Sequence, residues 1–253
     1  MATSVDLNAD MGESYGPWTM GDDAALLGVI SSANVACGGH AGDPVVMAAT
    51  VKSALENNVA IGAHPGFEDK QNFGRYELSL PIPVVARMVQ YQLGALQAIA
   101  KAEGGRVTHL KLHGSLANMA TRDQELAHAC FSAALDVDPD LLVFAIAATA
   151  QERAAQALNV RYAAEIFADR AYNPDATLVN RALPGAVIHD ADEAASRVVK
   201  MVEHGALFAL SGEVIPARID TICLHGDTAG AINIAHRVRS KLEASGISVS
   251  ATK

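Results

Sequence analysis

Six short apolar runs in this chain each end in a small group of polar residues, and in five of the six the group contains glycine. The groups are Met11-Gly12-Glu13, Gly38-Gly39-His40, His64-Pro65-Gly66, His113-Gly114-Ser115, Asp169-Arg170 and His225-Gly226-Asp227. Imidazoles and carboxylates can transfer protons or bind a divalent metal ion. In parallel α/β proteins, active-site residues collect at the carboxyl ends of the strands. Six such groups on one chain therefore predict an enzyme.

The first run carries an acidic or amide side chain at every second position. Successive side chains of a strand point to opposite faces, so Asp6, Asn8 and Asp10 share one face. If that face is the interior of a barrel, the three polar groups line up toward its mouth, where Glu13 follows. A solvated edge strand with a turn is the alternative interpretation.

Four histidines, His40, His64, His113 and His225, stand at or just after the ends of predicted strands. With nearby carboxylates they could bind zinc or a similar ion, or act as general acid and base with no metal. Those carboxylates are Asp6, Asp10 and Asp227. No compact signature such as HExxH is present, so both alternatives stay open. The other histidines are expected to be structural or exposed: His109, His128, His189, His204 and His236.

Three basic residues, Arg75, Lys111 and Arg170, lie in or beside the polar groups. Lys111 precedes His113 by two residues and should face the same side, where a buried ammonium needs a carboxylate or an anionic ligand. The Asp169-Arg170 pair could orient a substrate carboxylate or carbonyl, or form a structural salt bridge. These positions allow a small anionic substrate.

Strand-like and helix-like segments alternate along the chain, which predicts about seven βα units. The expected strands are residues 4–9, 31–37, 59–64, 109–114, 141–146, 162–168 and 220–225. The expected helices are 43–58, 83–103, 122–136, 191–204 and 229–245, with Asp43, Thr121, Asp190 and Thr228 as N-caps. Polar groups follow nearly every strand, which favours a closed TIM-like barrel over an open doubly wound sheet. Residues 1–253 would form one domain, with 170–189 as a lid.

The composition argues against several classes of protein. The net charge of −9 leaves no basic stripe for a nucleic-acid partner. No apolar run approaches membrane-spanning length. The three cysteines, Cys37, Cys130 and Cys223, are widely spaced, which favours reduced thiols and a cytoplasmic location. Cys37 and Cys223 are expected to be small buried apolar residues.

Six collinear motifs together resemble the LamB/YcsF family between about residues 5 and 232. They are DLNADMGESYGPWTMGDD, SANVACGGHAGDP, GAHPGFEDKQNFGR, KLHGSLAN, EIFADRAYNPDATLVNR and CLHGDTAGA. The resemblance implies a distorted seven-stranded (β/α) barrel related to polysaccharide deacetylases. It also implies ATP-dependent opening of the 5-oxoproline lactam to glutamate, with the 5-oxoprolinase subunits B and C as partners. The chain has no phosphate-binding loop, so ATP is expected to act mainly through the partners.

The resemblance also assigns roles to residues. The implied catalytic residues are Asp6, Asn8, Glu13, His40, His113, His225 and Asp227. The implied substrate-binding residues are Arg75, Lys111, Asp169 and Arg170. By analogy with the deacetylases, a divalent metal would be bound by Asp10, His64 and His113.

Two places depart from the family pattern. Gly39 replaces a common aromatic residue, and Leu112 and Ala117 stand where KPHGALYN has Pro and Tyr. We expect these changes to reshape the pocket wall and to affect substrate identity, not the fold. Two other functions stay open: a metal-dependent deacetylase or other carbohydrate-active hydrolase, and a non-catalytic binding subunit of an ATP-using complex.

Overall fold

Seven parallel strands form a closed barrel in the computed structural model, which describes residues 4–224 and 230–252. The strands are β1 (Ser4–Met11), β2 (Ser32–Ala36), β3 (Ala60–His64), β4 (Val107–Lys111), β5 (Leu142–Ile146), β6 (Tyr162–Phe167) and β9 (Thr221–Leu224). Each strand pairs with the next, and β9 pairs with both β6 and β1, which closes the ring. The predicted barrel is confirmed, and the open sheet is wrong.

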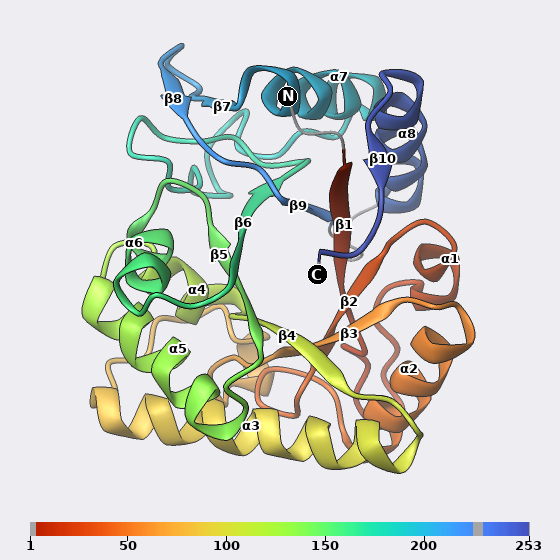
Figure 1. Cartoon of the computed structure of the whole chain (residues 1–253), viewed down its shortest axis with the longest axis vertical. Coiled ribbons are helices and arrows are strands. Elements are labelled where there is room, and N and C mark those ends of the chain that lie inside the picture. The colour runs from red at the N-terminus through yellow and green to blue at the C-terminus, as the bar shows by residue number, and fades with distance from the viewer. Residues whose placement is uncertain (1–3, 225–229, 253) are drawn as a thin grey trace.

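Helices surround the strands on the outside (Figure 1). They are α1 (Asp23–Leu27), α2 (Pro44–Glu56), α3 (Ile82–Ala102), α4 (Gly114–Ala120), α5 (Gln124–Val137), α6 (Ala150–Ala157), α7 (Ala191–His204) and α8 (Ala231–Ala244). A short hairpin, β7 (Ala206–Phe208) with β8 (Val214–Pro216), precedes β9, and β10 (Ser248–Val249) extends the sheet beside β1. Among the described residues, no helix combines the length and apolar character needed to cross a bilayer.

Several helix boundaries follow the predicted capping chemistry. The Asp43 carboxylate accepts hydrogen bonds from the amides of Val45 and Val46 at 2.8 and 2.9 Å, and Pro44 occupies the first turn of α2. Asn58 has a φ of 55°, so it ends this helix in the left-handed conformation as expected. Asp190 likewise caps α7.

The prediction was wrong between residues 109 and 123. The strand β4 ends at Lys111, because the chain turns at His113 directly into α4, a helix that the sequence did not predict. Thr121 ends α4, and α5 is capped by Asp123, whose carboxylate accepts from the amide of Leu126 at 3.0 Å. The predicted cap Thr228 lies outside the described residues.

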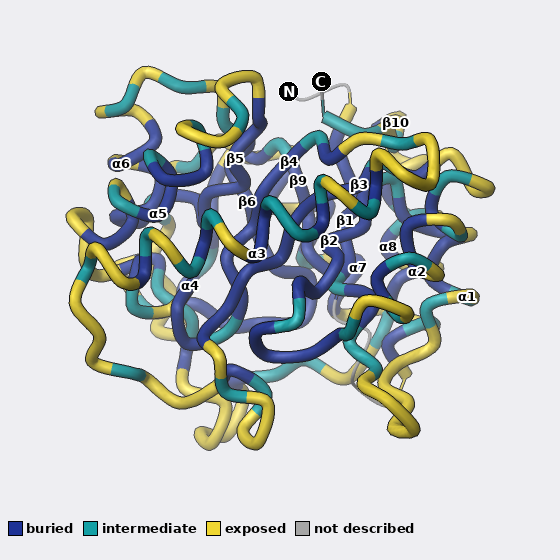
Figure 2. The backbone as a smooth tube through the Cα atoms, turned by 90° about the horizontal axis from the view of Figure 1, so that it is seen from below, coloured by how far each residue is buried: buried dark blue, intermediate teal, exposed yellow. Residues whose placement is uncertain are grey.

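The two faces of the barrel strands differ in chemistry. Leu7 and Ala9 of β1 point outward into the main apolar core beneath the helices, whereas Asp6 and Asn8 point inward and are both 0% exposed. The edge-strand interpretation of this segment is therefore wrong. Figure 2 shows the buried strands inside the molecule and exposed positions on the outer helix faces and loops.

Candidate active site

A cavity of about 480 Å³ lies at the carboxyl ends of the strands. The cavity is lined by acidic, basic and imidazole side chains. They include Asp10, Glu13, Glu165, Lys111, His64 and His113. Its walls come from α4 and from the chain between β6 and α7, residues 168–190, which we call the β6–α7 segment. The predicted lid thus forms one wall of the cavity.

Asp6 lies deeper in the barrel and is not among the residues that line the cavity. Its carboxylate accepts hydrogen bonds from Ser31, Ser32 and Thr221 at 2.6, 2.7 and 2.5 Å. Burial raises the pKa of Asp6, and these hydrogen bonds oppose the rise. The structure therefore places Asp6 beneath the site, where it joins three strands, and not beside the histidines.

Lys111 forms the centre of a buried polar network at the cavity floor. Its Nζ lies 2.8 Å from Asp10 Oδ1, 3.2 Å from Glu165 Oε1 and 3.0 Å from Cys223 Sγ. Burial alone would lower the pKa of Lys111, but Asp10, Cys223 and Glu165 raise it well above the ordinary value. As predicted, Lys111 pairs with a carboxylate, and it has two such partners, Asp10 and Glu165. Asn8 Oδ1 also accepts a hydrogen bond from the same ammonium at 3.3 Å. The site therefore contains a permanent cation.

Sequence reasoning missed Glu165, which is 1% exposed and lines the cavity. Burial raises the pKa of Glu165, while Lys111 lowers it. Asn8 Nδ2 donates to its Oε1 at 3.1 Å. The residue stands within a strand, before the polar group at Asp169-Arg170, so a search for polar strand ends does not find it. The available signal was the alternation of side chains along the strand, which places Glu165 on the same face as Phe167, two positions later.

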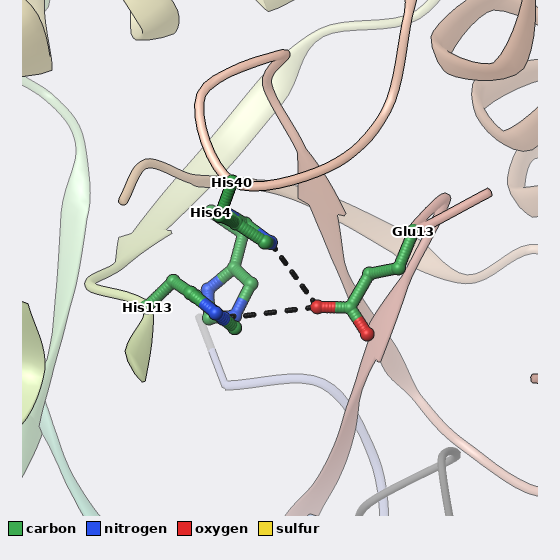
Figure 3. A group of neighbouring side chains, drawn as sticks. All are labelled: Glu13, His40, His64 and His113. Carbon is green, nitrogen blue, oxygen red and sulfur yellow. Dashed lines mark hydrogen bonds and ion pairs between the residues drawn. The ribbon is translucent and has the colours of Figure 1, made fainter. Parts of the chain in front are cut away.

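Glu13, His40, His64 and His113 form a buried cluster whose potential ligand atoms all lie within 4.8 Å of one another. Figure 3 shows the three imidazoles gathered on one side of the Glu13 carboxylate. Glu13 Oε1 lies 3.1 Å from His40 Nε2 and 3.7 Å from His113 Nδ1. The residues come from the loops or strand ends of β1 to β4, which are adjacent in the barrel. This cluster could bind a metal ion.

Backbone carbonyls fix the orientation of two of the imidazoles. His64 Nδ1 donates to Lys111 O at 2.9 Å, and His113 Nε2 donates to Phe73 O at 2.8 Å. In neutral rings, the remaining nitrogens therefore carry lone pairs, and these nitrogens face each other at 3.0 Å. Burial and the neighbouring His64 lower the pKa of His113 to about 3, which disfavours an imidazolium. A cation bound between these rings would remove the conflict between the two lone pairs.

The candidate ligand group differs from the predicted set of Asp10, His64 and His113. His64 and His113 belong to it, whereas Asp10 is tied to Lys111 and approaches His64 Nε2 only at 3.3 Å. Glu13 and His40, which the sequence predicted as catalytic residues, complete the cluster. His40 Nδ1 is buried and has no hydrogen-bond partner among the described residues. The His40 ring stacks on His113 with centroids 3.4 Å apart.

The remaining predicted residues occupy different places. Arg75 lines the cavity, and its guanidinium lies 5.0 Å from the Phe73 ring. Arg170 lines it too, while Asp169 is buried and is not among the lining residues. His225 and Asp227 lie outside the described residues. His109, expected to be structural or exposed, is buried in the barrel, where Nε2 lies 2.9 Å from Asn34 Oδ1.

Comparison with known proteins identifies the family. A model of the LamB/YcsF family matches residues 5–253. The chain belongs to the LamB/YcsF family. It is 57% identical over 249 residues to the A subunit of a 5-oxoprolinase from Ruegeria pomeroyi, with 98% of each chain covered.

Solved structures support the same grouping. A lactam utilization protein from Thermus thermophilus, a crystal structure, is 42% identical, with a TM-score of 0.92 over 98% of this chain and 100% of that one. A family 4 carbohydrate esterase from Streptomyces lividans has a TM-score of 0.53 at 12% identity, covering 99% of this chain and 93% of that one. This second likeness shows a shared fold alone.

Two of the three departures from the LamB/YcsF pattern lie in the cavity wall. Leu112 and Ala117 both line the cavity. Gly39 does not, but it faces the buried side chain of Gln92, and a methyl group there would lie 2.6 Å from Gln92 Oε1. Gln92 therefore occupies the space next to Gly39 in this chain.

Proposed function

We propose that this chain is the A subunit of an ATP-dependent 5-oxoprolinase and opens the 5-oxoproline lactam by hydrolysis to give glutamate. The observation that carries the proposal is the convergence of the buried histidine cluster with Lys111 and two carboxylates in one small cavity. The whole-length similarity to a chain named as the A subunit of 5-oxoprolinase supports this substrate.

The residues suit attack of water on an amide. Breaking a lactam requires a base for the water, an acid for the leaving nitrogen and a positive charge for the developing oxyanion. Glu13 and His40 are placed to take the proton of water, since their side chains lie 3.1 Å apart. Glu13, having taken that proton, would return it to the leaving nitrogen, while His113, 3.7 Å away, helps to position the carboxylate. Lys111 would stabilise the oxyanion, assisted by Arg75, another cation that lines the cavity.

We assign ATP binding mainly to the partner subunits B and C. An unstrained amide resists hydrolysis, so coupling to a nucleotide is chemically reasonable. The sequence contains neither a Walker-A loop nor a GxGxxG motif. We therefore place nucleotide binding mainly on the partners, and ring opening on this chain. Free buried thiols at Cys37, Cys130 and Cys223, together with the need for ATP, support a cytoplasmic complex.

The cluster also fits a divalent metal. Glu13, His40, His64 and His113 would hold it, since two of the imidazoles already donate their other N–H to backbone carbonyls, the arrangement usual for metal-binding histidines. Nitrogen and carboxylate ligands suit zinc or manganese. When bound, such an ion lowers the pKa of water and polarises a carbonyl.

Reconstitution tests the function. The chain, assembled with subunits B and C from one organism, should release glutamate from 5-oxoproline in the presence of ATP. His113→Ala should abolish release without disrupting assembly, whereas His128→Ala, on the exposed face of α5, should leave it unchanged. Full activity of the assembled His113→Ala complex would instead support a non-catalytic binding subunit. No turnover by a correctly assembled wild-type complex would reject the substrate, and deacetylation of acetylated sugars would then be measured.

A further inference from the structure

The cavity has an uneven distribution of charge. The acids Asp10 and Glu13 belong to β1 or its following loop, beside the histidine cluster. The β6–α7 segment contributes two arginines to the lining, Arg170 and Arg181. In the closed barrel, β4 and β5 separate β6 from β3, whereas β9 alone separates it from β1, so this segment lies across the barrel from His64. Glu165, near the end of β6, is paired with Lys111, so the charged residues that this segment itself adds to the lining are both arginines.

Several cations of the lining are engaged by neighbouring groups. Lys111 pairs with Asp10 and Glu165, and Arg122 pairs with Glu77. Arg170, which is 6% exposed, directs its guanidinium to its own segment: Nη2 donates to Val179 O at 2.8 Å and Nε to Ala186 O at 3.4 Å. Arg170 thus fixes the fold of the chain that carries Arg181.

Arg181 stands at a turn with a defined geometry. The amide of Leu183 donates to Asn180 O at 2.9 Å, and the Asn180 side chain accepts from the amide of Ala182 at 3.0 Å. Beneath the turn, Ala171, Val179 and Ala186 form a small apolar core of the segment. Arg181 itself is exposed and lines the cavity. The turn therefore preorganises the backbone of Arg181 beside the cavity that this residue lines.

Arg181 repels the guanidinium of Arg170 electrostatically, and Asp169 opposes this effect in part. Burial lowers the pKa of Arg170 to about 10, and Arg181 contributes to this lowering. An anion placed against this pair would relieve the repulsion. A guanidinium binds a carboxylate with two parallel hydrogen bonds, so a carboxylate is the anion that this geometry suits best.

We propose that Arg181 binds the carboxylate of the lactam substrate and that Arg170 is the residue that positions it. The proposal rests on the proposed function and deepens it. A cyclic amide with a carboxylate on the ring would place the acid group against the β6–α7 segment. The opposite orientation would set the carboxylate against Asp10 and Glu13, which is unfavourable for like charges. The amide would then face the histidine cluster and Lys111.

The test compares 5-oxoproline with 2-pyrrolidinone, the same ring without the carboxylate, in the assembled complex. Arg181→Gln should raise KM for 5-oxoproline by roughly 10- to 100-fold, with a much smaller change in kcat, and leave the handling of 2-pyrrolidinone unchanged. Arg181→Lys should restore part of the loss. Arg87→Gln, on the exposed face of α3, removes the same charge outside the cavity and should have no effect. An Arg181→Gln complex with wild-type KM, or with kcat reduced and KM unchanged, would overturn the proposal.

A binding measurement tests the carboxylate site even if the proposed function fails. If the wild-type complex does not turn over 5-oxoproline, the isolated chain is titrated by calorimetry with 5-oxoproline and 2-pyrrolidinone. Binding of the acid but not of the neutral ring, lost in Arg181→Gln, would support the carboxylate site by itself. Equal binding of both compounds, or binding of neither, would reject it.

Discussion

The side chain of Gln92 is bonded at both ends to the backbone of Gly66. Its Nε2 donates to Gly66 O at 2.7 Å, and its Oε1 accepts from the Gly66 amide at 3.1 Å. Gly66 in turn packs on the rings of His40 and His113, because a methyl group there would lie 2.9 Å from His40 Nδ1. A buried amide on the helix α3 thereby positions the backbone that the two stacked imidazoles contact.

Gly39→Ala should destabilise the protein by about 1–3 kcal/mol, because the new methyl group overlaps Gln92 Oε1 at 2.6 Å and Gly66 O at 2.8 Å. Gly94→Ala is the matched control, since nothing lies within 4 Å of the added carbon in the middle of α3. That control should stabilise the helix by about 0.5–1 kcal/mol. Urea unfolding measures both variants. Equal stability of the two alanine variants would contradict the packing of Gln92 against Gly39.

Lys111→Met should reduce the free energy of unfolding by about 3–5 kcal/mol near neutral pH, because Asp10 and Glu165 would keep buried charge without a cation. The folded pKa of Glu165 is raised by burial above its ordinary value of 4.5, and loss of Lys111 raises it further. The folded state then holds a proton that the unfolded chain releases, so stability falls as pH increases from 4.5 through the folded pKa.

Urea unfolding at about pH 5 and about pH 8 tests this sign. The loss of unfolding free energy in Lys111→Met, relative to wild type, should be larger at the higher pH. Adding Glu165→Gln should recover part of the deficit, because it removes one of the two uncompensated acids. A deficit that is independent of pH would show that Lys111 stabilises the fold by packing alone.

Protein purified without chelator should carry near-stoichiometric zinc or manganese, measured by elemental analysis. His64→Ala and Glu13→Gln should each lower the bound metal at least tenfold, as expected for loss of a ligand or of its support. His204→Ala, on the exposed end of α7, should retain it. Metal-free wild-type protein with full activity in the assembled complex would exclude a resident metal.

The three thiols should react slowly in the native state. Cys37, Cys130 and Cys223 are buried, and burial raises the pKa of Cys37 and of Cys130 to about 12. A thiolate is the reactive form, so a disulfide reagent should label all three only after unfolding in urea. Rapid labelling of one thiol in the native protein would identify a locally open strand.

The sequence predicted the barrel because polar residues at strand ends are a local signal. Alternation placed Asp6, Asn8 and Asp10 on one face. Glycine within two residues of each histidine marked the turns where His40, His64 and His113 converge. Gln92 and Glu165 were not found, since their roles depend on partners far along the chain: Gln92 bonds a backbone 26 residues away, and Glu165 meets Asn8 across 157 residues. The helix α4 was missed because only Leu112 and His113 separate it from the end of β4.

The contact between Asp6 and Thr221 joins the first and last barrel strands across 215 residues of chain. A growing polypeptide therefore lacks the floor of its cavity until nearly all of it has left the ribosome. Long-range pairings of this kind are made late and slowly. Completion of synthesis thus determines when the barrel can close, and a fragment cut before β9 would keep His40, His64 and His113 without enclosing them.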